Sequence, residues 1–468
     1  MNDRSSLSKA LESEPMPERD SKQQAAPRRL AVPLLLVAFP AILFYTILLR
    51  NVLDIPILDD YDALLDFVNH LIPLNGALAK ASYFLAAQHN EYKLYFVNGM
   101  AWLQVALLGH IDFRILSAIG DGFVLLLAIL LWKMFLPHHK DLAARLTLFI
   151  PVSWLLFQLQ YFETLNWSMA ALQNIPILVF SFAAIYFLIR GTRATFFGAV
   201  IFFILAVAAS GNGFLLIPVG LLILVVNRRY LRFAAWLVVS GGCIAVYAYH
   251  YNVLSSQTGP HRSVFSAFHP LAPAYVLAFI GSAASFPFKT GSLILGAMIC
   301  IFFCYLAWRG YIRRNPLVSC CILFLLLTAV GVAGIRSDFG LSQALNSRYT
   351  IYSALLLIFA WFAIVEAFLQ DKHAPFLSNN AFLGAVAIAV LFSLTMDGLG
   401  SMQIAGRHRK LIEAMAAYEH RSSQESAVGP APVLPGSNAM VTSLKFNGRI
   451  RPILAESIRL GIYRPPPL

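Results

Sequence analysis

One stretch near the start of the chain, LAVPLLLVAFPAILFYTILLRNVLDIPILDDYDALLDF (residues 30–67), indicates the class of fold. Its first part, residues 30–49, carries no charge and is long enough to cross a bilayer as a helix. The aspartates then follow closely: Asp54, Asp59, Asp60, Asp62 and Asp66. Because a carboxylate is costly inside lipid, these side chains are expected beyond the end of a membrane span, at the edge of the membrane.

The composition of the whole chain agrees with a membrane protein. Of 468 residues, 59% are hydrophobic and only 12% are charged, whereas soluble domains carry about 25% charged residues. The formal net charge is +12, but no separate basic domain is present to bind nucleic acid. Lys and Arg instead gather in short loops, where they set the orientation of membrane spans. We therefore expect an integral membrane protein that contacts lipid and has no nucleic-acid partner.

The apolar runs predict an all-α polytopic fold with about eleven transmembrane helices. The runs fall at 30–49, 115–136, 146–161, 169–189, 196–210, 214–226, 233–250, 291–308, 317–334, 349–369 and 381–398. A further run, 94–109, is shorter than a span requires and includes Asn98 and Gln104. We expect it to be partly embedded or to lie along the membrane surface. All five cysteines fall in apolar runs and are interpreted as small buried residues rather than metal ligands.

The distribution of Lys and Arg gives the expected topology. The loops 137–145, 190–193, 227–232 and 309–315 are basic and are predicted to be cytoplasmic. Residues 1–29 read as a disordered cytoplasmic leader, and residues 30–399 as the transmembrane domain with a long outer loop, 51–93. The tail, 400–468, is expected outside, although its start, GRHRK (406–410), is typical of a cytoplasmic segment.

The first outer loop holds an adjacent acidic pair, Asp59 and Asp60. Mutual repulsion raises the proton affinity of one member of such a pair. A carboxylate placed there can accept a proton from an attacking hydroxyl group, as a general base. The alternative is that the pair merely ends a span and faces water.

The same loop contains more polar groups and two amphipathic segments. Segments 61–72 and 76–88 are expected to lie as helices on the lipid headgroups. They precede QHNEYK (88–93), which supplies His89, Glu91 and Lys93. The loop therefore offers carboxylate, imidazole and ammonium groups at one membrane face.

Other outer loops supply candidate binding residues. These are Glu163 in QYFETLNW (160–167), His261 and Arg262 in QTGPHR (257–262), and Arg336, Arg348 and Tyr349 in GIRSDFGLSQALNSRYTIYS (334–353). Arg336 and Arg348 lie on the side where basic residues are normally scarce. A guanidinium fork matches a phosphate group, so phosphate binding is one interpretation of these arginines. Structural salt bridges to Asp338 or Asp60 are the other.

Four motifs carry a family resemblance: DDY (59–61), QHNEYK (88–93), GNGFLLIP (211–218) and SRYTIYS (347–353). Over roughly residues 30–370 the chain resembles the GT-C class of membrane glycosyltransferases. More narrowly, it is similar to a set of bacterial multi-span proteins with the pattern DDW, HNEHR, NGLLLWP and SRY. Tyr61 stands where that pattern has Trp, and Lys93 gives a point charge where the pattern has a guanidinium fork.

The resemblance implies transfer of a sugar from a polyprenyl-phosphate donor to a glycan, lipid or protein acceptor. The reaction would take place on the periplasmic side of a bacterial cytoplasmic membrane and invert the anomeric centre. An acid of the first outer loop is the base in this class, so Asp59 is the first candidate and Asp60 the second. The candidate donor-binding residues are His89, Glu91, Lys93, Glu163, His261, Arg262, Arg336, Arg348 and Tyr349. No cofactor is required, although Asp59, Asp60 and Glu91 could hold a divalent cation.

Two other functions stay open at this point. A glycan polymerase or ligase would share the substrate class but depend mainly on Arg and His in a late outer loop. A lipid or solute transporter, or a flippase, would place charges near the middle of the membrane on broken helices. The clearest candidate residues here lie near one surface; Glu366 and Asp397 are the exceptions, and each is expected near a span end.

Overall fold

The computed structural model describes residues 19–137, 139–252, 270–286, 288–370, 379–425 and 450–466. These residues are almost all helical and contain no β-strand. Nine of the described helices are long and apolar enough to cross a membrane. The expectation of an all-α, multi-pass membrane protein is therefore confirmed.

The nine candidate spans coincide with nine of the eleven expected apolar runs. They are Leu30–Asn51, Phe113–Met134, Leu142–Tyr161, Ser168–Arg190, Tyr230–Ala248, Lys289–Trp308, Pro316–Phe339, Ser347–Ala367 and Asn380–Tyr418. The other two runs form α9 (Arg193–Ala209) and, after the short helix η3 (Gly211–Leu215), α10 (Leu216–Val226). These two helices have 17 and 11 residues, fewer than the roughly 20 that a full crossing needs. Helix α4 (Tyr95–Leu108), with 14 residues, is also short.

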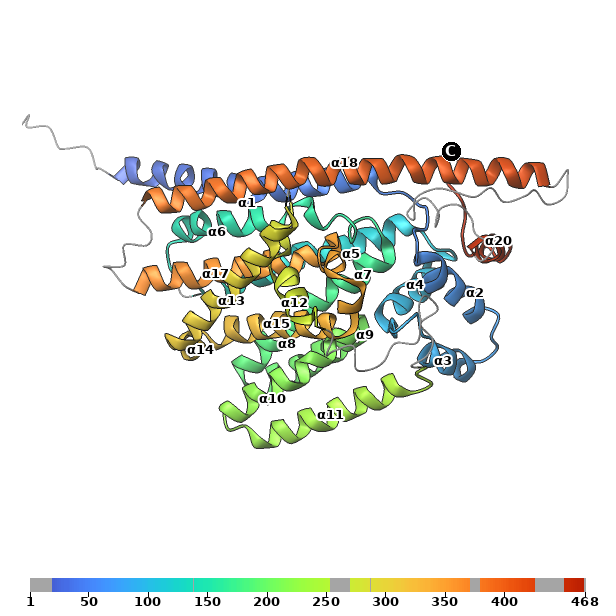
Figure 1. The fold of residues 1–468 in the computed structure, drawn as a ribbon, viewed down its shortest axis with the longest axis horizontal. Coiled ribbons are helices and arrows are strands. Elements are labelled where there is room, and N and C mark those ends of the chain that lie inside the picture. The colour runs from blue at the N-terminus through green and yellow to red at the C-terminus, as the bar shows by residue number, and fades with distance from the viewer. Residues whose placement is uncertain are drawn as a thin grey trace, which may run out of the picture.

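The long helices form a bundle whose edges are visible in Figure 1. Helices α1 (Arg19–Asn51) and α18 (Asn379–Glu425) lie side by side along one edge, and α11 (Tyr230–Ala248) runs along the opposite edge. Between them are α5 (Phe113–Met134), α6 (Leu142–Leu156), α7 (Ser168–Asn174), α8 (Pro176–Arg190), α12 (Ala272–Ile280), α13 (Lys289–Trp308), α15 (Pro316–Arg336) and α17 (Thr350–Gln370).

The two ends of the bundle differ in their short elements. One end carries the π-helical turn η1 (Tyr61–Asp66), α2 (Phe67–Leu71), α3 (Ala77–Ala86) and α20 (Ile450–Arg459), and we call it the loop end. The opposite, basic end carries α14 (Tyr311–Arg314) and the turns that contain Arg190, Arg193, Arg228 and Arg229. The remaining short helices are η2 (Leu159–Tyr161), η5 (Ser282–Ala284), η6 (Ser337–Phe339), α16 (Leu341–Ala344) and η7 (Ser347–Tyr349).

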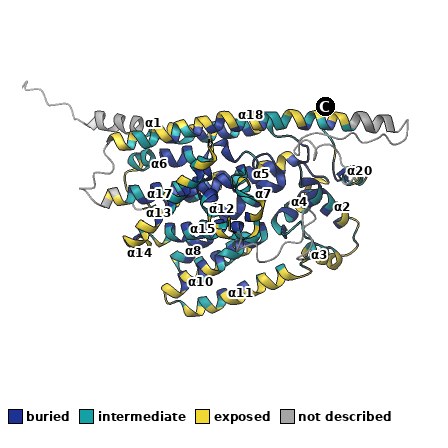
Figure 2. Cartoon of the chain, in the orientation of Figure 1, coloured by how far each residue is buried: buried dark blue, intermediate teal, exposed yellow. Residues whose placement is uncertain are grey.

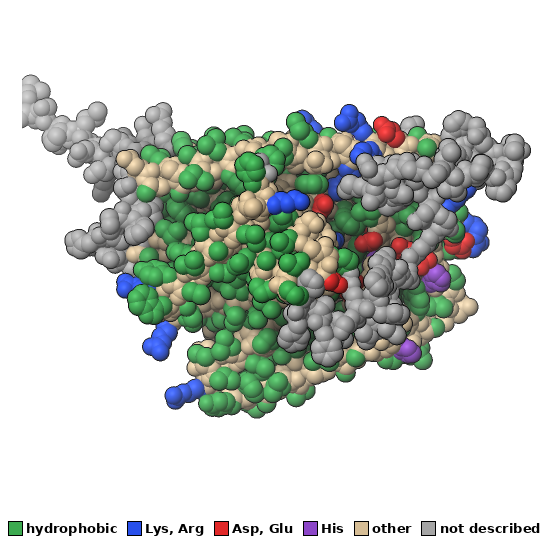
Figure 3. Space-filling model, viewed as in Figure 1, with side chains coloured by type: hydrophobic (Ala, Val, Ile, Leu, Met, Phe, Trp, Pro, Cys, Tyr) green, Lys and Arg blue, Asp and Glu red, His purple; other side chains and the backbone are tan. Residues whose placement is uncertain are grey.

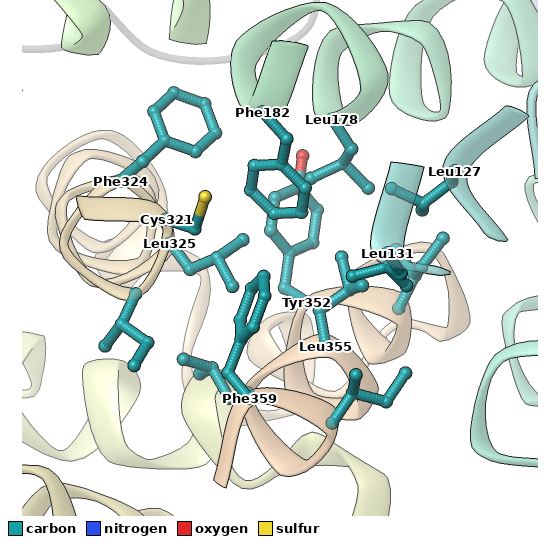
Figure 4. Packing of buried hydrophobic residues seen from close by; sticks show 14 of the residues in the cluster. Leu127, Leu131, Leu178, Phe182, Cys321, Phe324, Leu325, Tyr352, Leu355 and Phe359 are labelled. Atoms are coloured by element: carbon teal, nitrogen blue, oxygen red, sulfur yellow. The ribbon is translucent and has the colours of Figure 1, made fainter. Parts of the chain in front are cut away.

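The core of the bundle is a continuous apolar cluster shared by central helices. Figure 4 shows side chains from α5, α8, α15 and α17 pointing toward one another, among them Leu131, Phe182, Leu325 and Phe359. Figure 2 shows exposed residues along the outward faces of peripheral helices such as α11. On α11 the exposed side chains are themselves apolar, for example Leu231 at 86% and Val238 at 75%. This combination of a packed interior and an apolar exterior is what a helix bundle in lipid requires.

A second apolar cluster lies at the loop end and overturns one expectation. Segment 61–72 does not rest on lipid, because Leu64, Leu65, Val68 and Leu71 are completely buried in protein. Their cover comes from the tail: Leu411 and Met415 of α18, Ile450 and Leu454 of α20, and Ile462 and Tyr463 beyond it. The prediction was wrong because it could not foresee that the tail forms amphipathic helices of its own. By contrast, α3 has no buried residue, and its Leu78 is 85% exposed.

One helix runs across the expected boundary at residue 399. Helix α18 runs without interruption from Asn379 to Glu425, so the transmembrane segment and the first part of the tail are one helix. Glycine in the middle of this helix serves close packing rather than a break: a Cβ atom on Gly400 would lie 2.4 Å from the Cβ atom of Leu159.

The leader, too, is partly helical. Helix α1 begins at Arg19 rather than near residue 30, and residues 1–18 lie outside the described residues. Residues 19–26 (RDSKQQAA) favour helix, and an adjoining apolar helix removes the cost of nucleation.

Candidate functional site at the loop end

The two members of the acidic pair occupy different environments. Asp60 is 1% exposed, and both carboxylate oxygens accept backbone hydrogen bonds, from Ile57 N at 2.9 Å and from Met169 N at 2.8 Å. Burial raises the pKa of Asp60 to about 7, against the lowering effect of these two bonds. The Asp59 side chain, in contrast, is 42% exposed. Asp60 therefore holds the loop in place, and Asp59 is the member that can meet a substrate.

A sharp turn places the pair at the start of a helix. Leu58 has φ +48°, an unusual value for a branched side chain, and the chain then enters η1. The backbone oxygen of Asp59 accepts a hydrogen bond from Ala63 N at 2.7 Å. A left-handed non-glycine residue and a π-helical turn are both features that gather at functional sites. The turn sets Asp59 at the positive end of the helix dipole, where a carboxylate is stabilised.

Positive groups surround Asp59. The Nε2 atom of His89 lies 3.8 Å from its Oδ2 atom. Burial alone would raise the pKa of Asp59, but His89 and the charges of Arg348 and Arg336 lower it below the ordinary value. Asp59 is therefore ionised at neutral pH. Residues that are far apart in sequence, 59, 89, 336 and 348, share one electrostatic environment. Figure 3 shows that the acidic side chains visible on this face of the molecule lie in the half toward the loop end.

A tight turn presents the next group of candidate residues. His89 and Tyr92 exchange two backbone hydrogen bonds of 2.9 Å, and Asn90 takes the left-handed conformation, with φ +49°. Asn tolerates that conformation better than most residues. The Nδ2 atom of Asn90 lies 3.0 Å from Nε2 of His89. The turn thus directs His89 to Asp59 and leaves Glu91 and Tyr92 facing Arg336.

Arg336 is bound to that turn. Its Nη2 atom lies 2.6 Å from Oε1 of Glu91 and donates to the Tyr92 hydroxyl at 3.2 Å. The partner is an acid of the first loop, which the sequence analysis did not consider. The side chain is 16% exposed, so the end of α15 is joined to residues 91–92 in a mostly dry environment.

Arg348 is held through its backbone rather than through its guanidinium group. Its backbone N–H donates to Oε2 of Glu163 at 3.4 Å, and its Cζ atom lies 5.3 Å from the centre of the Tyr349 ring. Glu163 in turn donates its own backbone N–H to Ser347 Oγ at 3.1 Å. The Nε atom of Arg348 is buried and has no hydrogen-bond partner among the described residues. Glu163 and Ser347 therefore fix the backbone of η7, while the guanidinium group is left for another partner.

Lys93 is placed differently from the other candidates. Its side chain is completely buried, and the ammonium group donates to the backbone oxygens of Leu85, Ala86 and Tyr249. These oxygens lie at the C-terminal ends of α3 and α11, where carbonyl groups lack helical partners. Burial lowers the pKa of Lys93. Because its three N–H groups are used, Lys93 joins two helix ends to the 89–92 turn and has no donor left for a phosphate.

One central residue was not identified from the sequence. Arg407 of α18 donates to the backbone oxygen of Leu165, and its charge interacts with Asp60, Asp121 and Glu163. The signal was the GRHRK segment, which was interpreted only as an orientation signal. Arg407 provides positive charge to three acids around the site.

The last two candidate residues and the suggested divalent cation remain. His261 and Arg262 lie outside the described residues. Within the described part of the chain, no group of three His, Cys, Asp or Glu side chains could hold a metal ion. Asp60 is saturated by backbone amides and Glu91 is paired with Arg336. The suggested cation set of Asp59, Asp60 and Glu91 therefore does not fit a metal.

Comparisons with known proteins leave the family open. No protein-family model matches this chain. A search of curated proteins found no match either.

Replacement of Lys93 by Met should lower the free energy of unfolding by about 1–3 kcal/mol, because the carbonyl groups at two helix ends lose their donor inside the protein. Thermal unfolding of the purified protein in detergent measures this effect. Lys410→Met, at an exposed position of the same end, is the control and should change little. A Lys93→Met protein with normal stability but no donor binding would instead make Lys93 a phosphate ligand.

Proposed function

We propose that this protein is a GT-C-type glycosyltransferase that moves a sugar from a polyprenyl-phosphate donor to a hydroxyl group of a glycan, lipid or protein. One observation carries the proposal: an ionised, half-exposed carboxylate, Asp59, shares its surroundings with Arg336 and Arg348, which come from a distant part of the chain. A base beside a cationic phosphate site is the arrangement that such a transfer needs.

The roles follow from the charges. The acceptor oxygen attacks the anomeric carbon while its proton passes to Asp59, which is ionised and exposed. The bond between that carbon and the phosphate oxygen breaks, and its electron pair leaves with the phosphate. Arg348, with Arg336 nearby, stabilises the negative charge that develops on the departing group. Attack opposite the phosphate inverts the anomeric centre.

The membrane setting fits a lipid-linked donor. The energy for transfer is stored in the sugar–phosphate bond, so no nucleotide is consumed at the site. The apolar outer faces of the helices are suited to a polyprenyl chain, and the polar groups gather at one end of the bundle, where a headgroup would lie. We propose that the basic end faces the cytoplasm and the loop end faces the periplasm of a bacterial cytoplasmic membrane, in accordance with the positive-inside rule.

Two of the acids inside the spans, Glu366 and Asp397, are held by structural hydrogen bonds, and this favours surface chemistry over transport. Glu366 accepts hydrogen bonds from the Tyr311 hydroxyl at 2.8 Å and from Asn315 at 2.7 Å. Asp397 accepts from the backbone N–H of Leu159 at 3.0 Å. Both acids are committed to structural hydrogen bonds, whereas a transporter needs groups that can exchange partners near the middle of the membrane.

The test is a transfer assay on the full chain in lipid vesicles with radiolabelled undecaprenyl-phosphate monosaccharides and bacterial membranes as the source of acceptor. The proposal expects labelled product and release of undecaprenyl phosphate. Movement of labelled lipid between leaflets without a new glycosidic bond would identify a flippase and overturn the proposal.

In the same assay, Arg348→Lys should weaken donor binding roughly tenfold or more, because Lys cannot form the two parallel bonds of a guanidinium group with phosphate. The loss should raise KM for the donor and also lower kcat, because Arg348 is proposed to stabilise the charge on the departing phosphate as well. Arg114→Lys, at a surface ion pair of the same end, is the matched control. An unchanged KM for the donor in Arg348→Lys would remove Arg348 from the phosphate site.

A further inference from the structure

Three polar atoms in the region of Arg336 and Arg348 are buried without a hydrogen-bond partner among the described residues. They are the Tyr275 hydroxyl, the Ser337 Oγ atom and the Arg348 Nε atom. The Tyr275 and Ser337 side chains are both completely inaccessible, at 0% exposed. A buried hydroxyl without a partner costs free energy, so a cluster of such groups calls for an explanation.

The three atoms belong to one place in the fold. Tyr275 lies on α12, and it is near enough to Arg336, Arg348 and Tyr92 for their charges to interact. Phe279, one turn later on α12, packs against Tyr349, with ring centres 5.1 Å apart. Ser337 follows Arg336 directly in the chain and begins η6. Helix α12 therefore places Tyr275 near the two arginines, and Ser337 follows Arg336 directly at the end of α15.

The chemistry of the cluster selects one kind of ligand. A tyrosine hydroxyl, a serine hydroxyl and a guanidinium N–H can all donate hydrogen bonds. Arg336 is paired with Glu91, whereas the side-chain Nε of Arg348 has no partner among the described residues and can donate to an anion. The complementary group carries negative charge and several acceptor oxygens, and among lipid-linked substrates that group is a phosphate.

We propose that Tyr275, Ser337 and Arg348 Nε form a phosphate subsite that takes the phosphate of a prenyl phosphate, with Arg336 as the second cation. The inference rests on the proposed function for the lipid part of the ligand, but it predicts phosphate binding whether or not transfer occurs. Tyr275 and Ser337 become donor-binding residues that neither the motifs nor the charge pattern of the sequence indicated.

The test measures binding of farnesyl phosphate to the full chain in lipid nanodiscs. Tyr275→Phe and Ser337→Ala each remove one hydroxyl and keep the packing. Each should weaken farnesyl phosphate binding roughly tenfold, and the double variant more. Farnesol, which has the same chain without phosphate, should bind the wild type and both variants equally.

Two controls separate the subsite from general effects of buried hydroxyl groups. Ser181→Ala on α8 removes a hydroxyl that is likewise buried and without a partner among the described residues, and Tyr311→Phe removes a tyrosine hydroxyl at the basic end. Neither should change the affinity. Competition by inorganic phosphate that both subsite variants weaken supports a site for the phosphate group itself.

The possible results distinguish the subsite from the transfer function. Unchanged farnesyl phosphate affinity in Tyr275→Phe and Ser337→Ala overturns the subsite, and so does an equal loss of farnesol binding. If those variants bind normally while Asp59→Asn abolishes transfer, the subsite is wrong and the proposed function stands. If they bind weakly while Asp59→Asn still transfers sugar, the subsite stands and the proposed base is wrong.

Discussion

Replacement of Asp59 by Asn should reduce sugar transfer by about 10²- to 10⁴-fold, the usual contribution of a general base. Asn has nearly the same shape but cannot accept the proton of the acceptor hydroxyl. Donor binding should stay close to that of the wild type, because the phosphate is held by the arginines. The measurements are the rate of transfer under saturating donor and the affinity for farnesyl phosphate.

The control is Asp66→Asn, at an exposed acid of the same segment that pairs with His70, and it should keep wild-type activity. The pH dependence gives a second check. The pKa of Asp59 lies below its ordinary value of 3.8, so the base should remain ionised throughout the neutral and mildly acidic range. The loss of activity that protonation of Asp59 causes should therefore appear at a lower pH than an ordinary aspartate would give. Full activity of Asp59→Asn would exclude Asp59 as the base.

Replacement of Arg407 by Met should lower the free energy of unfolding by about 3–5 kcal/mol, the typical cost of leaving a buried charge without its partner. Arg407 interacts with Asp60, Asp121 and Glu163, and the first two of these acids are buried. Thermal unfolding in detergent measures the effect. Arg409→Met, two residues later and exposed, should be nearly neutral.

The loss of stability in Arg407→Met should grow as the pH rises. The pKa of Asp60 is raised to about 7 in the folded protein, so folding favours its protonated form. That stabilisation is present at low pH and is lost as the pH rises through about 7. Removal of Arg407 makes the ionised form still less favourable. The variant should therefore fall further below the wild type at pH 8 than at pH 5, and a loss that is the same at both values would contradict a role through Asp60.

The sequence predicted the parts of this structure that depend on local composition. A long apolar run indicates a membrane span without reference to any other part of the chain. Nine of the eleven expected runs form helices long and apolar enough to cross a membrane. The acid-rich turn after the first span was also recognisable, because carboxylates avoid lipid. Segments α9 and α10 were also expected to be spans but form shorter helices, because apolar composition alone does not set helix length.

The predictions that the structure did not bear out concern residues whose partners lie far away in the chain. Segment 61–72 has an apolar face that suits lipid headgroups and protein equally well, and only the fold shows that α18 and α20 cover it. Lys93 and Arg336 are both cations in predicted outer loops, yet one donates to three carbonyl groups and the other pairs with Glu91. A sequence shows the charge of each side chain, but it does not show which residue that side chain will contact.

The attachment of the C-terminal segment also sets the order in which the site can form. Ser457 donates to Asn69, 388 residues earlier, and the Tyr463 hydroxyl donates to the backbone oxygen of Asp54 at 2.7 Å. A ribosome therefore releases the acidic turn several hundred residues before its cover. Until residues 450–463 have been made, the newborn chain lacks part of the cover over the apolar side of residues 61–71 and lacks the completed site. Shortened products of translation would carry the same partly uncovered surface, which is the kind that chaperones and quality-control proteases bind.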